Sequence, residues 1–148
     1  MEGDGVTGSV TAGRGSLRRY VHMAVPAARV WALAGDPARI AEWFPGIVAC
    51  TIDGTTRVVT TASGIAMPEE IVTHDPLQRR FQYRITAPIV RQHLSTLDIL
   101  DLGDGTSLAV YSVDADPASM ALILAGAAGN ALEHLRHLLE GHLLEGKT

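Results

Sequence analysis

Residues 119–144, SMALILAGAAGNALEHLRHLLEGHLL, have the pattern of one long α-helix. Apolar residues recur at the 3.6-residue period and form one stripe: Leu124, Ala128, Ala131, Leu135, Leu138 and Leu139. Polar residues such as Glu133 and Arg136 fall on the other side, and Gly126 and Gly129 are the points at which the helix could be interrupted. With a rise of about 1.5 Å per residue, this is the one predicted element long enough to cover the face of a sheet.

Seven segments ahead of this helix have the features of strands, and turn sequences such as Asp53-Gly54 separate them. The predicted strands are residues 17–25, 47–53, 56–62, 65–73, 79–86, 92–102 and 106–114. The alternation is clearest where Phe81, Tyr83 and Ile85 are interspersed with Arg80, Gln82 and Arg84. Because side chains alternate across a strand, we expect the first three in the core and the other three outside.

Two short helices are predicted between the first two strands, at residues 26–34 and 36–44. Pro26 suits the first position of one helix, and Asp36 is a natural N-cap of the other. The order is therefore one strand, two short helices, six strands and a long helix. This order predicts an α+β fold in which a curved seven-stranded antiparallel sheet wraps around the C-terminal helix and the short helices close one end.

The chain has 148 residues, which favours a single domain. Its 12 Lys and Arg residues against 16 Asp and Glu residues give a net charge of −4, and no basic stripe indicates a nucleic-acid partner. The lone Cys50 excludes an internal disulfide and suits a reducing compartment. Residues 1–15 contain no apolar block. We therefore expect a flexible leader over residues 1–15, one domain over residues 16–148, no transmembrane segment and a cytoplasmic location.

Several local motifs occur in an order that resembles the SRPBCC superfamily of START-like, polyketide cyclase/dehydrase-like proteins. The matching stretches are residues 25–33 (VPAARVWAL), Asp36 with residues 43–46 (WFPG), residues 70–72 (EIV), Asp75, residues 83–85 (YRI) and residues 103–106 (GDGT). No single motif is specific, but their order and spacing together span about residues 17–140.

This resemblance implies the helix-grip fold, with a hydrophobic cavity between the sheet and the long helix. Members of the superfamily bind lipids, sterols, polyketides, plant hormones or quinones, and some cyclise or dehydrate polyketides. Because one fold hosts many activities, the function has to be argued from the cavity itself.

Glu70 and His93 are the two candidate catalytic residues. Glu70 and Val72 are two residues apart and therefore point to the same face of their predicted strand, and the resemblance places a glutamate at position 70. Burial in the cavity would raise the pKa of its carboxyl and suit it to proton transfer; the alternative is an ion pair with Arg84 or Arg57. An inward-facing His93 would exchange protons near neutral pH. Otherwise it points to solvent or caps the cavity with a hydrogen bond.

Five residues are candidates for ligand binding. Tyr83 and Tyr111 each combine an apolar ring with a hydroxyl that can orient a ligand, although both could be ordinary core aromatics. Trp43 and Phe44 lie at the end of the second short helix, where they would gate the cavity or plug the end of the sheet. Asn130, beside the small Gly/Ala segment of the long helix, could reach a ligand or remain solvated.

No metal or other cofactor is predicted. His134 and His137 have the spacing of two ligands on one helix, but no third ligand is fixed nearby. There is no phosphate-binding glycine loop, no Gly-x-Ser-x-Gly elbow and no nucleophile signature around Cys50. Hydride transfer, phosphoryl transfer and serine or cysteine hydrolysis are therefore disfavoured.

Three hypotheses for the function remain. The favoured one is binding or transport of a small hydrophobic or amphipathic molecule (lipid-, polyketide- or isoprenoid-like) in the cavity. The alternative is a polyketide cyclase, aromatase or dehydratase that uses acid–base residues of the cavity. A third is a subunit with a collapsed cavity and an assembly role. Binding is favoured because no pair of titratable residues has a spacing that enforces a hydrogen-bonded dyad. We expect a monomer or a homodimer.

Overall fold

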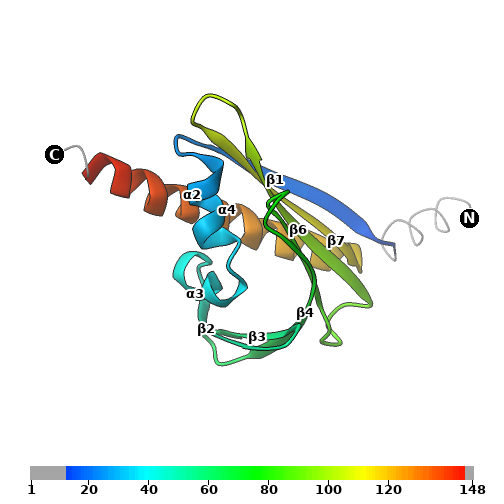
Figure 1. The fold of residues 1–148 in the computed structure, drawn as a ribbon. Helices are drawn as coiled ribbons and strands as arrows, with labels where there is room; N and C mark the ends of the chain where they lie inside the picture. Colours follow the sequence, from blue (N-terminus) through cyan, green and yellow to red (C-terminus); the bar gives the residue numbers. More distant parts are fainter. Residues whose placement is uncertain (1–12, 146–148) are drawn as a thin grey trace, which may run out of the picture.

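The computed structural model describes residues 13–145 (Figure 1). The elements are β1 (Gly15–Met23), α2 (Ala27–Ala34), the 3-10 helix η1 (Pro37–Arg39), α3 (Ile40–Trp43), β2 (Ile47–Asp53), β3 (Thr56–Thr61), β4 (Ala66–Asp75), β5 (Arg80–Ile85), β6 (Gln92–Asp101), β7 (Ser107–Asp116) and α4 (Ala118–Glu145). This order confirms the predicted α+β helix-grip architecture.

The seven strands form one antiparallel sheet in the order β1-β7-β6-β5-β4-β3-β2. Strands β4, β3 and β2 curve away from α4 in the lower part of Figure 1. Phe81 and Tyr83 face the core at 3% and 7% exposure, whereas Arg80 and Arg84 are exposed. The predicted inward and outward faces of β5 are therefore confirmed.

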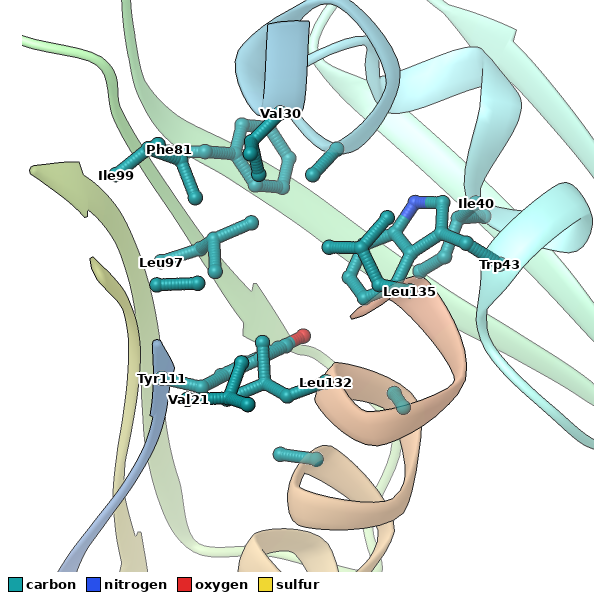
Figure 2. Packing of buried hydrophobic residues seen from close by; sticks show 14 of the residues in the cluster. Val21, Val30, Ile40, Trp43, Phe81, Leu97, Ile99, Tyr111, Leu132 and Leu135 are labelled. Carbon is teal, nitrogen blue, oxygen red and sulfur yellow. The ribbon is translucent and has the colours of Figure 1, made fainter. Parts of the chain in front are cut away.

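Helix α4 packs against β1 and β7 and runs without a break through Gly126 and Gly129. The buried side chains of its first half are small (Ala121, Ala125 and Ala128), and those of its second half are larger (Leu132 and Leu135). Figure 2 shows the two leucines packed among aromatic and aliphatic side chains of the sheet and of α3. The second half of α4 therefore fills the core, while the first half leaves room beside the sheet.

The short helices follow the capping chemistry of their sequences. Pro26 is the N-cap of α2 and not its first residue, so this helix begins one residue later than predicted. Asp36 is the N-cap of η1, and its side chain accepts a hydrogen bond from the Ala38 N–H at 3.0 Å. The predicted helix over residues 36–44 is divided into η1 and α3. Within the described residues, 13–145, no helix is both long and apolar enough to span a bilayer.

Most of the expected leader lies outside the described residues, which begin at Gly13. Gly15 is the first residue of β1 and pairs with Ala115 of β7. The Gly13 carbonyl accepts a hydrogen bond from the Ala118 N–H at 2.9 Å. Gly15 is thus part of the sheet, and Gly13 is hydrogen-bonded to the first residue of α4.

Candidate functional site

A pocket of about 500 Å³ lies between the concave face of the sheet and the first half of α4. The connection from α3 to β2 and the turn between β3 and β4 complete its wall. Its lining is mostly apolar and includes Ile40, Phe44, Ile47, Val59, Met67, Ile85 and Leu124. Ala127 and Ala128 also line it, so the small residues of α4 provide its volume.

The polar part of the pocket wall is built on a buried ion pair between neighbouring strands. Arg57 of β3 lies directly opposite Glu69 of β4 in the sheet register, and the two residues are 1% and 5% exposed. Arg57 Nε donates a hydrogen bond to Glu69 Oε1 at 2.8 Å, and Nη2 lies 2.7 Å from the same oxygen. Arg57 Nη1 donates to the Pro37 carbonyl at 3.0 Å. The guanidinium also stacks over the rings of Tyr83 and Phe81, 4.9 and 5.1 Å from their centroids.

Glu69 is the carboxyl group among the residues that line the pocket. Both contacts from Arg57 go to Oε1, and within residues 13–145 no hydrogen bond to Oε2 is found. Burial raises the pKa of Glu69, and the charge of Arg57 opposes that rise. A carboxyl in this environment is better suited to holding or moving a proton than an exposed glutamate is.

Two tyrosine hydroxyls meet at the pocket wall. Tyr83 Oη and Tyr111 Oη are 2.5 Å apart, and both rings are buried. Burial raises the pKa of Tyr83 to about 12; the charge of Glu69 adds to this rise, and the charge of Arg57 and the hydrogen bond with Tyr111 oppose it. The pKa of Tyr111 is likewise raised, first of all by burial. Both residues line the pocket, and both hydroxyls remain protonated at neutral pH.

Glu70 does not face the pocket. Its side chain is 51% exposed on the outer face, where it lies 3.6 Å from Arg84 Nη2, as the ion-pair alternative proposed. The inward carboxylate is its neighbour Glu69, which is buried. Glu69 is on the same face of β4 as Met67 and Ile71, which pack against the core, whereas Val72 is on the outer face. Adjacent residues of a strand point to opposite faces, so an error of one position exchanges the pocket for solvent.

His93 is buried at 6% exposure, and both of its ring nitrogens have partners. Nδ1 accepts a hydrogen bond from the Ile85 N–H at 2.8 Å, and Nε2 lies 2.8 Å from Ser95 Oγ. Burial lowers the pKa of His93 to about 4, so the ring is neutral at pH 7. Its ring lies on a second hollow, of about 580 Å³, that Arg14, Arg84 and Arg91 also line. His93 does not itself line the apolar pocket, but it contacts three residues that do: Ser95, Ile85 and Tyr83, whose ring centroid is 5.7 Å from that of His93.

The three remaining candidates occupy different environments. Phe44 lines the pocket, and its ring meets that of Tyr111 edge-on at 6.3 Å. Trp43 is 3% exposed and packs in the core near Leu135 (Figure 2). Its ring centroid is 5.7 Å from that of Phe44, and this buried position fits a plug at the end of the sheet better than a gate. Asn130 is exposed on α4 and does not line the pocket.

No group of three or more His, Cys, Asp or Glu side chains within the described part of the chain is arranged to hold a metal ion. Sequence analysis missed two polar residues of the pocket wall, Glu69 and Ser95, and it considered Arg57 as a partner of Glu70 and not of Glu69. The signal for the Arg57–Glu69 pair is the position of the two residues opposite one another across the β3–β4 hairpin.

Comparison with known proteins supports the same architecture. The model of a family described as "Polyketide cyclase / dehydrase and lipid transport" matches residues 14–140. The protein XoxI from Bacillus cereus is 20% identical, with a TM-score of 0.79 over 84% of this chain and 94% of that one. Norcoclaurine synthase from Thalictrum flavum, in complex with dopamine and hydroxybenzaldehyde, is 14% identical, with a TM-score of 0.70 over 90% of each chain.

The di-domain ARO/CYC BexL from the BE-7585A biosynthetic pathway is 16% identical, with a TM-score of 0.72 over 84% of this chain and 46% of that chain. At these identities the solved structures show a shared fold. None of the curated proteins matches the sequence.

Proposed function

Because the chain belongs to the polyketide cyclase/dehydrase and lipid transport family of the SRPBCC superfamily, we propose that it binds a small apolar or amphipathic molecule in the pocket between the sheet and α4. The observation that carries this proposal is a mostly apolar pocket of about 500 Å³ with Glu69, Tyr83 and Tyr111 gathered on its wall. Apolar walls stabilise a bound ligand by about 25 cal/mol per Å² of apolar surface removed from water. The polar groups would orient it.

Titration with the neutral fluorescent probe N-phenyl-1-naphthylamine tests this proposal. Ala127→Phe adds a ring at the pocket wall, whereas Ile123→Phe adds the same ring at a position of α4 that is 62% exposed. We expect Ala127→Phe to weaken probe binding at least tenfold and Ile123→Phe to leave it unchanged. Equal affinity in both variants, or no binding to the parent protein, would contradict the proposal. Native mass spectrometry of the protein from its own host would identify a co-purified ligand.

An enzymatic function is the second candidate, and the buried Glu69 favours it. A carboxyl with a raised pKa and a free oxygen stands in the same pocket as two hydroxyl donors. Such a set could remove a proton beside a carbonyl group while a hydroxyl stabilises the enolate oxygen. The similarity to the cyclase BexL and to norcoclaurine synthase is compatible with chemistry of this kind.

Hydrogen–deuterium exchange of 1-tetralone in D₂O, followed by NMR, separates the two candidates. An enzyme would accelerate exchange of the protons beside the carbonyl, and Glu69→Gln would lower that acceleration by about 10²–10⁴. Glu70→Gln, the matched change on the outer face, would leave it intact. No acceleration by the parent protein, despite tetralone binding, would favour binding alone.

A further inference from the structure

One carboxylate oxygen of Glu69 is open to the pocket and has no donor. Arg57 Nε donates to Oε1 at 2.8 Å, and Arg57 Nη2 lies 2.7 Å from the same oxygen. Within residues 13–145 no N–H or O–H group donates to Oε2, and this atom is not fully enclosed by protein. Glu69 lines the pocket although the residue is only 5% exposed, so the open part of its carboxylate lies on the pocket side. A buried polar atom in such a position normally has a hydrogen-bond partner.

The ion pair keeps this carboxyl in its charged form. The Arg57 guanidinium remains protonated at neutral pH, and the residue is 1% exposed. Its other hydrogen-bond acceptor is the uncharged Pro37 carbonyl. Protonation of Glu69 would therefore leave the charge of Arg57 buried without a counter-charge, which is strongly unfavourable. Oε2 is thus an ionised acceptor, and its natural partner is a hydrogen-bond donor.

The charges around the pocket decide which donor fits. Among the described residues that line the pocket, Glu69 is the only charged one. Arg57 lies behind the wall, since its guanidinium stacks over Tyr83 and Phe81 and its Nη2 is fully enclosed. A ligand carboxylate would therefore meet Glu69 with no cation within reach. A ligand ammonium would meet an ion pair whose net charge is already zero, and burial of its own charge would be uncompensated.

We infer that the pocket takes an uncharged amphipathic ligand whose alcohol or phenol hydroxyl donates to Glu69 Oε2 while its apolar body lies against the apolar wall. This inference rests on the proposed binding function and adds the chemical class of the ligand. It also excludes ligands that carry a carboxylate at the end that approaches Glu69.

Four compounds with one naphthalene frame test the selectivity of the parent protein at pH 7. They are 2-naphthol, 2-methoxynaphthalene, 2-naphthoate and 2-naphthylmethylammonium, which place a neutral donor, an ether without a donor, an anion and a cation on that frame. Each competes with N-phenyl-1-naphthylamine, so the dissociation constants come from displacement of that probe. A hydrogen bond to a charged group is worth at least a factor of about ten. We expect 2-naphthol to bind at least tenfold tighter than each of the other three.

Glu69→Gln tests whether this carboxylate causes the selectivity. Because Arg57 can only donate, the amide oxygen of the glutamine should turn to Arg57 and its NH₂ group to the pocket. Both 2-naphthol and 2-methoxynaphthalene can accept from that group, so the preference for naphthol should fall to about twofold or less. The repulsion of 2-naphthoate is removed and the Arg57 charge is no longer balanced, so naphthoate should gain at least tenfold relative to 2-methoxynaphthalene. A loss of packing alone would not produce this gain.

The comparisons use ratios of affinities within one variant, so a general loss of affinity cancels from them. Glu70→Gln makes the same change on the outer face and should keep the parent order of ligands. The double variant Arg57→Met/Glu69→Met removes both charges and should also lose the naphthol preference, which keeps the test available if Glu69→Gln does not fold.

Two kinds of failure are distinguishable. If the probe binds to the parent protein but 2-naphthol binds no tighter than 2-methoxynaphthalene, or 2-naphthoate or the ammonium binds tightest, the inference is overturned and the proposed binding function stands. An unchanged naphthol preference in Glu69→Gln would also overturn it. If the probe does not bind, the proposed function itself fails.

Discussion

Removal of the buried Arg57 guanidinium should destabilise the fold far more than removal of Arg84, an arginine of β5 on the outer face of the same sheet. Arg57→Met keeps an unbranched side chain of similar reach but leaves Glu69 buried without its cation. It also removes the donor to the Pro37 carbonyl and the stacking over Tyr83 and Phe81. Breaking a buried pair on one side costs about 3–5 kcal/mol, because an uncompensated charge remains.

The control is Arg84→Met, which breaks the Arg84–Glu70 pair. Both partners of that pair are half exposed and 3.6 Å apart, so water screens the charge that is left behind. An exposed pair of this kind contributes about 0–1 kcal/mol. For a domain of this size, 1 kcal/mol corresponds to about 2–4 °C in the unfolding midpoint. Arg57→Met should therefore lower the midpoint by roughly 6–20 °C, and Arg84→Met by a few degrees at most.

The cost of Arg57→Met should also depend on pH. Without Arg57 the folded pKa of Glu69 rises further above its unfolded value, so the folded state binds this proton more tightly. The variant therefore regains stability relative to the parent as the pH falls from 8 towards 5. The low pKa of His93 affects both proteins alike and cancels from the difference.

Urea unfolding followed by tryptophan fluorescence is a suitable assay, since Trp43 is buried beside the pocket. The double variant Arg57→Met/Glu69→Met should be more stable than Arg57→Met, because no charge is left in the core. A cost for Arg57→Met within 1 kcal/mol of that for Arg84→Met, or a cost that does not change between pH 8 and pH 5, would refute the electrostatic account of the pair.

The remaining tests use glycine substitution and titration. Gly15→Ala should cost about 1–3 kcal/mol in urea unfolding, because the new Cβ would lie 2.8 Å from that of Ala121. Gly126→Ala, whose Cβ meets open space on α4, should instead add about 0.5–1 kcal/mol, and a loss there would contradict its placement. Tyrosinate absorbance should show Tyr83 ionising near pH 12, with its share of stability lost as the pH rises from 10 to 12. NMR should give His93 a pKa of about 4, with its share of stability lost as the pH falls from 6.5 to 4; a value near 6.5 would contradict its burial.

The fold could be predicted because its determinants are local. Turn sequences such as Asp53-Gly54 separate the strands, and glycines with positive φ occupy several of those turns. The alternation in β5 and the apolar stripe of α4 then identify the two faces that meet in the core. The division of residues 36–44 into η1 and α3 was not predicted, because helix type over so short a span depends on packing rather than on propensity.

Sequence analysis placed the pocket carboxylate at Glu70 and not at Glu69, because each face of β4 carries an apolar residue close to these glutamates. Ile71 and Val72 are adjacent, so either Glu69 or Glu70 has an apolar residue two positions along. The structure resolves this with an irregularity between Ile71 and Thr73, where Val72 is left out of the pairing with β5 and is 44% exposed. Such a bulge changes which residues face inward along one strand, and no local propensity reveals it.

Pairing with both neighbouring strands supplies the information that β4 alone lacks. Arg57 of β3 lies directly opposite Glu69, and Arg84 of β5 lies directly opposite Glu70. Each carboxylate therefore has an arginine opposite it, and the face of that arginine decides which pair is buried. Arg84 alternates with the buried Tyr83 and Ile85 and so points outward, and Glu70 points outward with it. The alternation of β5, which the sequence does predict, thus places the titratable group of the pocket at Glu69 once the β4–β5 register is known, and Arg57 supplies the opposite charge that a buried carboxylate needs.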